Sequence, residues 1–158
     1  MDIGAYCLMP NHFHLLIKET REGGISLFMQ KLATGYTMYF NACNDRTGAL
    51  FGGRFKTKHV EDDRYFKRLI NYIHANPIEL VERGWKAGII LDPHACSEQI
   101  ATYRYSSFTD YQEDRIESRI LELDSVKDLY EGALTTSAKE VMEESLIFIQ
   151  KEKPLYKG

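Results

Sequence analysis

The sequence predicts an α+β fold that begins with two strands and continues with helices. Two short β-prone segments, residues 3–8 and 12–18, flank Met9, Pro10 and Asn11, and the last two of these are frequent in turns. Beyond Gly24, apolar residues recur at helical spacing in several longer segments. A chain of 158 residues with 44% hydrophobic content is long enough to bury the core that such a fold requires.

The first predicted helix begins near Ser26, a plausible N-cap, and runs to about Cys43. Its apolar positions are Leu27, Phe28, Leu32, Met38 and Tyr39. A loop rich in Gly, Asn and Asp follows over residues 44–53, and basic residues then alternate with others over residues 54–60. Because a strand has a side-chain period of two, this alternation predicts a strand with one basic face.

A second helix is predicted from Asp62 or Asp63, either of which can cap it, to Pro77. The apolar stripe consists of Phe66, Leu69, Ile70 and Ile73, at spacings i, i+3, i+4 and i+7. At about 100° per residue, Tyr72 lies beside this stripe and not within it.

The remaining segments carry weaker signals. After Pro77 we expect a short helical end, a turn around Gly84, a brief apolar run over residues 89–91, and a loop over residues 92–107. Residues 116–130 and 137–151 are predicted helices joined by a turn that contains Gly132, and residues 154–158 are predicted to be a frayed end.

Composition and charge narrow the class of protein. No apolar run approaches the roughly 20 residues that span a bilayer, and no signal pattern opens the chain, which predicts a cytoplasmic protein. The cysteines at 7, 43 and 96 have no metal-site or disulfide spacing. The net charge is −3, but residues 1–109 hold 13 basic against 11 acidic residues, whereas residues 110–152 hold 5 against 12. The acidity therefore belongs to the C-terminal segment.

His12 and His14 form the first candidate site. Residues i and i+2 of a strand point to one face, so the two imidazoles project side by side while Phe13 points away. Two neutral imidazole nitrogens at this spacing suit a divalent metal. The structural alternative is a pair of half-buried histidines on a sheet.

The second candidate site is one face of the second helix. Tyr72 and Asn76 are four residues apart and stack on that face, and Arg68 precedes Tyr72 by four. A tyrosine can act as a nucleophile, an amide oxygen can bind a metal, and a guanidinium can bind a phosphate in a bidentate manner. The alternative is a packing tyrosine with its hydroxyl at the rim of the core.

Three ordered motifs make the chain recognisable. Residues 6–16 are YCLMPNHFHLL, residues 50–56 are LFGGRFK, and residues 72–77 are YIHANP. Together they resemble the IS200-like single-tyrosine transposases, also called HUH transposases, and most closely the REP-associated tyrosine transposase branch. The resemblance runs from residue 2 to about residue 111 and includes YSSF at residues 105–108.

The resemblance implies a site and a fold. His12 and His14 match the metal-binding pair of the family, Asn76 matches its third ligand, and Tyr72 matches its nucleophile. The metal would be Mg²⁺ or Mn²⁺. The fold would be an antiparallel sheet of ferredoxin or RRM type with packed helices, here lacking the first strand and helix of the family, over residues 1–111. Residues 112–158 would form an acidic helical extension.

The implied activity is that of a metal-dependent endonuclease and strand transferase. Its partner would be single-stranded DNA with hairpin or repeat ends, and its intermediate a 5′-phosphotyrosine link. The sequence leaves open whether the site is built within one chain or across a homodimer. We expect DNA contacts from a set of basic and aromatic residues: Arg54, Lys56, Lys58, Arg68, Phe51 and Phe55.

Three alternatives stand beside this function. The basic strand could instead be an edge strand that its lysines keep soluble. The chain could be an inactive, truncated relative that binds nucleic acid without cutting it. It could also be a zinc hydrolase, although a tight zinc site usually has a third His, Cys or carboxylate ligand.

Overall fold

A computed structural model describes residues 1–60, 62–113, 117–129, 134 and 137–152. The chain forms two compact units. We call the first the helical unit; it consists of Met1 and residues 19–59. The second, the sheet unit, consists of residues 2–18 and 60–158. The described residues contain two strands and five α-helices, which confirms the α+β class.

The sheet unit begins with the predicted hairpin. Strand β1 (Asp2–Leu8) pairs antiparallel with β2 (Phe13–Lys18), with Cys7 opposite His14. The other edge of β1 is partly covered, because Leu8 N donates to Tyr105 O (2.8 Å) and Ser107 N donates to Tyr6 O (2.9 Å). The hairpin is confirmed, while a sheet of ferredoxin or RRM type stays a prediction.

Helix α2 (Asp63–Ala75) is the middle layer of the sheet unit. Asp62 caps it, since Asp62 Oδ1 accepts a hydrogen bond from Tyr65 N (3.2 Å). The predicted stripe is confirmed: Phe66, Ile70 and Ile73 are buried against the hairpin. We call this cluster the sheet core, and its other buried members are Ala5, Cys7, Met9, Leu16 and Val126.

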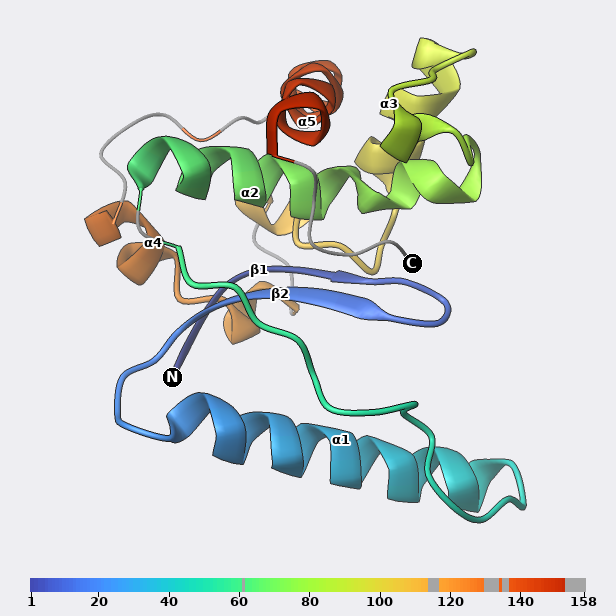
Figure 1. The fold of residues 1–158 in the computed structure, drawn as a ribbon, viewed down its shortest axis with the longest axis vertical. Helices are drawn as coiled ribbons and strands as arrows, with labels where there is room; N and C mark the ends of the chain where they lie inside the picture. The colour runs from blue at the N-terminus through green and yellow to red at the C-terminus, as the bar shows by residue number, and fades with distance from the viewer. Residues whose placement is uncertain (61, 114–116, 130–133, 135–136, 153–158) are drawn as a thin grey trace. The chain divides into compact units, whose positions relative to one another are not determined.

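A second core covers the opposite side of α2. Here α5 (Ala138–Glu152) packs on α2, away from the hairpin, and α3 (Pro93–Thr102) packs on α5 and on the turn of 3₁₀ helix, Asn76–Leu80, that continues α2 (Figure 1). We call this cluster the helix core, and its members include Tyr72, Ala75, Trp85, Ile100 and Phe148. Helix α2 is therefore buried on two sides, which its own apolar stripe did not reveal.

Between Asn76 and Ser107 the structure is more regular than predicted. Two 3₁₀ helices, Asn76–Leu80 and Trp85–Ala87, follow α2. The predicted loop over residues 92–107 is wrong in its first part, because α3 occupies Pro93–Thr102. Asp92 caps this helix by accepting from Ala95 N (3.0 Å), and Pro93 supplies a first residue with helical φ.

The C-terminal segment departs from prediction in one helix and agrees in the other. The continuous helix predicted over residues 116–130 is wrong, because a 3₁₀ helix (Glu117–Ile120) precedes a short α4 (Leu123–Leu129). Glu122 N donates to Ile3 O (2.9 Å), which anchors this break to β1. The last predicted helix is confirmed as α5. Gly132 and residues 154–158 lie outside the described residues.

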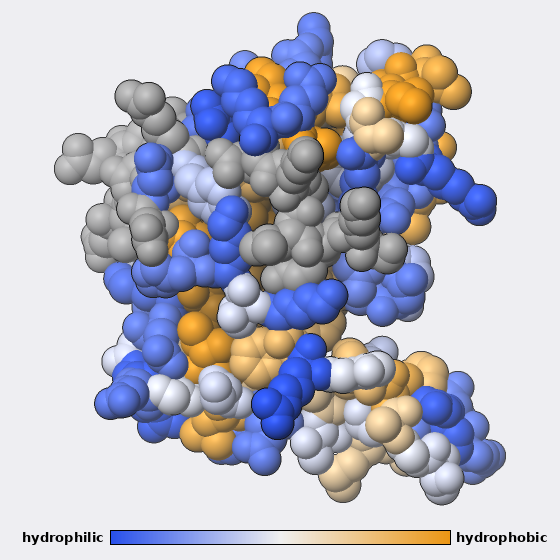
Figure 2. Space-filling view, in the orientation of Figure 1, coloured by the Kyte–Doolittle hydropathy of each residue, from blue (hydrophilic) through white to orange (hydrophobic). Residues whose placement is uncertain are grey.

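In the helical unit, α1 (Gly24–Cys43) begins two residues before the predicted Ser26 cap. Gly23, at φ 72°, takes the cap position in a left-handed conformation that glycine tolerates. Several large apolar side chains of α1 are exposed, including Leu32, Met38 and Tyr39, and Figure 2 shows apolar side chains at the surface in this region. No described helix is long and apolar enough to cross a membrane.

The predicted basic strand over residues 54–60 is wrong. These residues have no regular secondary structure, and residues 54–59 are exposed. A strand needs a partner for its backbone hydrogen bonds, and within the described part of the chain only β1 and β2 pair as strands. The alternating basic residues therefore do not lie on one face of a strand.

Candidate functional site

The structure brings four of the predicted site residues together within the sheet unit. His12 lies just before β2 and His14 lies in it, with their ring centroids 5.0 Å apart. The centroid of His14 is 6.1 Å from that of Tyr72, which α2 contributes. Asn76 begins the 3₁₀ helix that continues α2. The hairpin and the C-terminal half of α2 thus form the two sides of one site.

Three buried polar atoms at this site have no hydrogen-bond partner among the described residues. They are His14 Nε2, the Tyr72 hydroxyl and Asn76 Oδ1. The Asn76 amide is fixed by its nitrogen, because Nδ2 donates to Tyr72 O at 2.8 Å. Buried polar groups are normally paired, and each unpaired one costs about 1–3 kcal/mol. A group from outside the chain would remove this cost.

An imidazole nitrogen and an amide oxygen are donors that suit a divalent cation. His12 can supply a further nitrogen, since its Nδ1 lies 2.7 Å from Asn11 Oδ1. When Nδ1 carries the proton for that contact, Nε2 keeps its lone pair for a metal. His12, His14 and Asn76 therefore fit a metal in donor type.

Burial and charge set the protonation of the site. Burial, followed by the charges of His12 and Lys86, lowers the pKa of His14 to about 4, although Glu79 and the Asn76 amide act in the opposite direction. The Asn76 side chain therefore lies next to the His14 ring and interacts with it, although the contact does not have the geometry of a full hydrogen bond. Burial and Lys86 also lower the pKa of His12. Both imidazoles are neutral at pH 7, the form that binds metals.

Tyr72 lies deeper than predicted. Its side chain is 3% exposed, its ring stacks on Trp85 (5.7 Å between centroids, 29° between planes), and Phe148 lies 5.3 Å away. Tyr72 does lie outside the stripe of Phe66, Ile70 and Ile73, as predicted, but it is buried all the same, because the helix core supplies a second apolar surface against α2. Burial, followed by Glu79 and Tyr65, raises the pKa of Tyr72 to about 12. Its hydroxyl is protonated at pH 7.

Of the predicted DNA contacts, one belongs to the same unit as this site. Arg68 lies one turn before Tyr72 on α2 and is partly buried, but it is not among the groups that shift the pKa of Tyr72, His12 or His14. The other predicted contacts belong to the helical unit: Arg54, Lys56, Lys58, Phe51 and Phe55. Their role stays a prediction.

Sequence reasoning missed three residues around Tyr72. Trp85 is fully buried and stacks on the Tyr72 ring. Glu79 and Lys86 form an ion pair, with Oε2 and Nζ 2.6 Å apart, and both act electrostatically on His12 and His14. These residues lie in two 3₁₀ helices joined by a turn, a region without an apolar period that could have indicated their direction.

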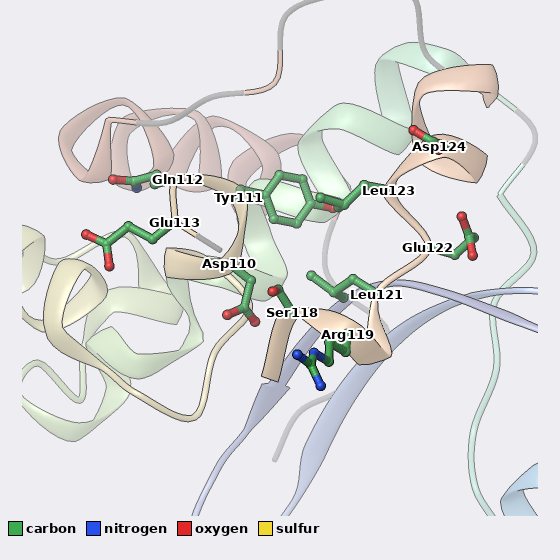
Figure 3. Close-up of a pocket in the computed structure, with 10 residues that line it drawn as sticks. All are labelled: Asp110, Tyr111, Gln112, Glu113, Ser118, Arg119, Leu121, Glu122, Leu123 and Asp124. Carbon is green, nitrogen blue, oxygen red and sulfur yellow. The ribbon is translucent and has the colours of Figure 1, made fainter. Parts of the chain in front are cut away.

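Two further observations bound the site. In the part of the chain that the structure describes, no three His, Cys, Asp or Glu side chains are grouped to hold a metal, so an amide oxygen is needed to complete the set above. A surface hollow of about 470 Å³ is lined by residues between Asp110 and Asp124 (Figure 3). None of the predicted site residues lines it.

One comparison with known proteins gives a match. Residues 1–76 match the family model described as "Transposase IS200 like", which supports the resemblance drawn from the motifs and suggests a DNA-processing enzyme. The matched range contains His12, His14 and Tyr72 and ends at Asn76. No curated protein and no solved structure matches the chain.

Proposed function

We propose that this chain is an IS200-like transposase, of the REP-associated branch, that cuts and rejoins single-stranded DNA. The observation that carries the proposal is the group of unpaired buried atoms, His14 Nε2, Asn76 Oδ1 and the Tyr72 hydroxyl, on residues within the matched family range. These residues lie in one unit of one chain, which favours a site built in cis over one shared by a homodimer.

His12, His14 and Asn76 would hold a divalent ion, Mg²⁺ or Mn²⁺. When bound, such an ion acts as a Lewis acid that polarises the scissile phosphate. The low pKa of His14 keeps its nitrogen available down to about pH 4. The Asn76 amide is already oriented by its bond to the carbonyl of Tyr72, so little side-chain entropy is lost on binding.

Tyr72 supplies the nucleophile. Its oxygen attacks the phosphorus, the new bond joins Tyr72 to the 5′-phosphate, and the bond from phosphorus to the 3′-oxygen breaks. The tyrosine proton is released as this bond forms and the leaving 3′-oxygen takes up a proton, so charge and protons balance. A second 3′-hydroxyl reverses these steps on another strand, so no nucleotide cofactor is consumed. Trp85 and Phe148 hold the ring in place during both steps.

The DNA would be a single strand with hairpin or repeat ends. Arg54, Lys56 and Lys58 are exposed and can follow a flexible phosphate backbone even without strand geometry. Replacing all three by Gln should weaken binding and flatten its salt dependence, by a slope of about 0.7 per lost phosphate contact. An unchanged slope in fluorescence anisotropy would place the DNA elsewhere.

A covalent adduct tests the chemistry. Wild-type protein, Mn²⁺ and a hairpin-containing single strand should give a protein–DNA species that survives a denaturing gel. Tyr72→Phe removes only the hydroxyl and should abolish that species. Tyr65→Phe is the matched control, since Tyr65 lies on the same helix and contacts Phe148 (5.4 Å). An equal adduct from Tyr72→Phe would refute the proposal.

The burial of Tyr72 favours one competing function, a nucleic-acid-binding domain without chemistry. Such a domain would bind the same hairpin strand, with or without metal, and give no adduct. A zinc hydrolase is separated from both by metal analysis, because it would retain zinc through purification.

A further inference from the structure

The Glu79–Lys86 ion pair lies next to the candidate site but outside the residues matched to the family model. Its side chains are 35% and 23% exposed, respectively, so both can be reached from solvent. Glu79 lies in the 3₁₀ helix that begins with Asn76. Lys86 follows Trp85, whose ring stacks on Tyr72. Glu79 is therefore close along the chain to Asn76, a residue of the site, and Lys86 is next to Trp85, which contacts the site through Tyr72.

The charges of the pair act on the side chains of the site that would contact the DNA. Lys86 and Glu79 both act on His12 and His14, and Glu79 also acts on Tyr72. The Lys86 charge acts on both imidazoles, whereas the pKa shift of Tyr72 comes from burial, Glu79 and Tyr65. Arg68, which the helix spacing had suggested for this role, contributes to none of these three shifts.

A cation beside the candidate site would complement the negative charge of a bound phosphate. The site's predicted donors and nucleophile are neutral side chains, whereas the scissile phosphate is negative and gains charge on its oxygens as tyrosine attacks. Cations that bind these oxygens lower the barrier, as lysines commonly do in phosphoryl transfer. A lysine paired with a single carboxylate can exchange that carboxylate for a phosphate and remain paired with an anion.

Resting on the proposed function, we propose that Lys86 binds the phosphate that Tyr72 attacks, and that Glu79 holds the Lys86 ammonium at the rim of the site before DNA arrives. The pair is thus a pre-positioned phosphate clamp. When the phosphate takes the ammonium, the Glu79 carboxylate is released toward solvent.

The first experiment measures binding without cleavage. In a Tyr72→Phe background, Lys86→Met should weaken binding of a hairpin-containing single strand about tenfold, the usual size of one hydrogen bond to a charged group. When the scissile phosphate, mapped with wild-type protein, is replaced by an uncharged methylphosphonate, Lys86→Met should have almost no effect. Lys139→Met is the control, because Lys139 is exposed and paired with Glu143 on α5.

Two further variants separate a folding defect from a lost phosphate contact. Lys86→Arg keeps the charge and should restore most of the affinity. The double variant Glu79→Gln/Lys86→Met leaves no unpaired carboxylate and should show the same loss as Lys86→Met alone. An equal loss on both the natural and the methylphosphonate strands would overturn the clamp, because it would show a structural role.

Metal binding gives a second readout in the absence of DNA. Removing a cation beside two imidazoles should leave Mn²⁺ affinity unchanged or raise it in Lys86→Met, as electron paramagnetic resonance of free Mn²⁺ can measure. Weaker Mn²⁺ binding would contradict the inference, because a merely structural pair would disorder the ligands when broken.

The two proposals fail in different ways. If wild-type protein gives no adduct, the proposed function falls and the clamp falls with it. If wild-type protein gives an adduct, and Lys86→Met forms it at the same rate and binds the natural strand equally well, only the clamp is refuted.

Discussion

Two polar clusters lie on either side of the end of α2, and they differ in whether their buried polar atoms have hydrogen-bond partners. On one side, His74 Nε2 lies 2.9 Å from Ser107 Oγ, which also accepts from Tyr6 N (2.8 Å). The Tyr6 hydroxyl donates to Asp110 Oδ2 (2.6 Å). On the other side, His14, Tyr72 and Asn76 each leave an atom unpaired.

This difference in hydrogen bonding indicates a different role for each cluster. The His74 cluster joins α2 to β1 and to the segment after α3 with groups the chain itself provides, and only His74 Nδ1 among its side-chain atoms is unpaired in the described structure. The His14 cluster leaves three buried atoms without a hydrogen-bond partner, as expected of a site that receives an external group. We therefore expect His74 to govern stability and His14 to govern activity.

The largest effect should follow from His14→Ala. If His14 is a metal ligand as proposed, its loss should reduce the rate of adduct formation about a thousandfold, which corresponds to the several kcal/mol that a Lewis acid contributes. The free energy of unfolding should change little, since an unpaired nitrogen is removed with the ring. Single-turnover gels and urea unfolding measure the two quantities. A large loss of stability with normal cleavage would contradict this prediction, because it would give His14 the structural role expected of His74.

His74→Ala should have the opposite profile. The side chain is 1% exposed and its loss opens a cavity and frees Ser107, so we expect the free energy of unfolding to fall by about 3 kcal/mol. Below the unfolding transition, adduct formation should stay within a few fold of wild type. Urea titration at constant pH checks the stability, and a thousandfold loss of activity in folded protein would place His74 in the site.

Acidification should sharpen the contrast. Burial lowers the pKa of His74 from 6.5 to about 3, so the unfolded chain takes up a proton below pH 6.5 while the folded chain does not. The stability that depends on neutral His74 is complete above pH 6.5 and is lost as the pH falls toward 3. Between pH 7 and 5 the loss is about 2 kcal/mol for one fully buried imidazole. In urea titrations, His74→Ala and His14→Ala should flatten the profile nearly equally down to pH 5, and only the His74 contribution should keep changing between pH 4 and 3, where His14, with a pKa of about 4, is already protonated in the folded chain.

The smallest effect separates two tyrosines. Tyr72→Phe removes an unpaired buried hydroxyl and should raise the free energy of unfolding by up to about 1 kcal/mol in metal-free protein. Tyr6→Phe removes a hydroxyl bonded to Asp110 and should lower it by about the same amount. Thermal unfolding of both variants in chelator gives the sign, and destabilisation by Tyr72→Phe would show that its hydroxyl has a partner.

Sequence reasoning succeeded where one element decided the outcome. The period of two placed His12 beside His14, and the stripe of Phe66, Ile70 and Ile73 placed one face of α2 on the hairpin. It failed where several elements decided together. The depth of Tyr72 depends on Trp85 and Phe148, which lie far along the chain.

Other misses had local causes. Asp92 and Pro93 were a usable start signal for α3, but no strong apolar stripe followed them. Lys56 and Lys58 alternate as in a strand, yet no neighbouring strand pairs with them in the described chain. The roles of Tyr72 and of its neighbours in catalysis stay predictions.

The bond from Asn76 Nδ2 to Tyr72 O has a mechanical consequence. Tyr72 and Asn76 are held together where α2 ends, whereas His12 and His14 belong to the hairpin. The sheet core, where Phe66, Ile70 and Ile73 pack on the strands, sets the distance between these two pairs. If the pairs hold an ion as proposed, apolar side chains that never touch that ion decide which ionic radius fits, and shortening Ile70 would change the ion preference without altering a proposed ligand.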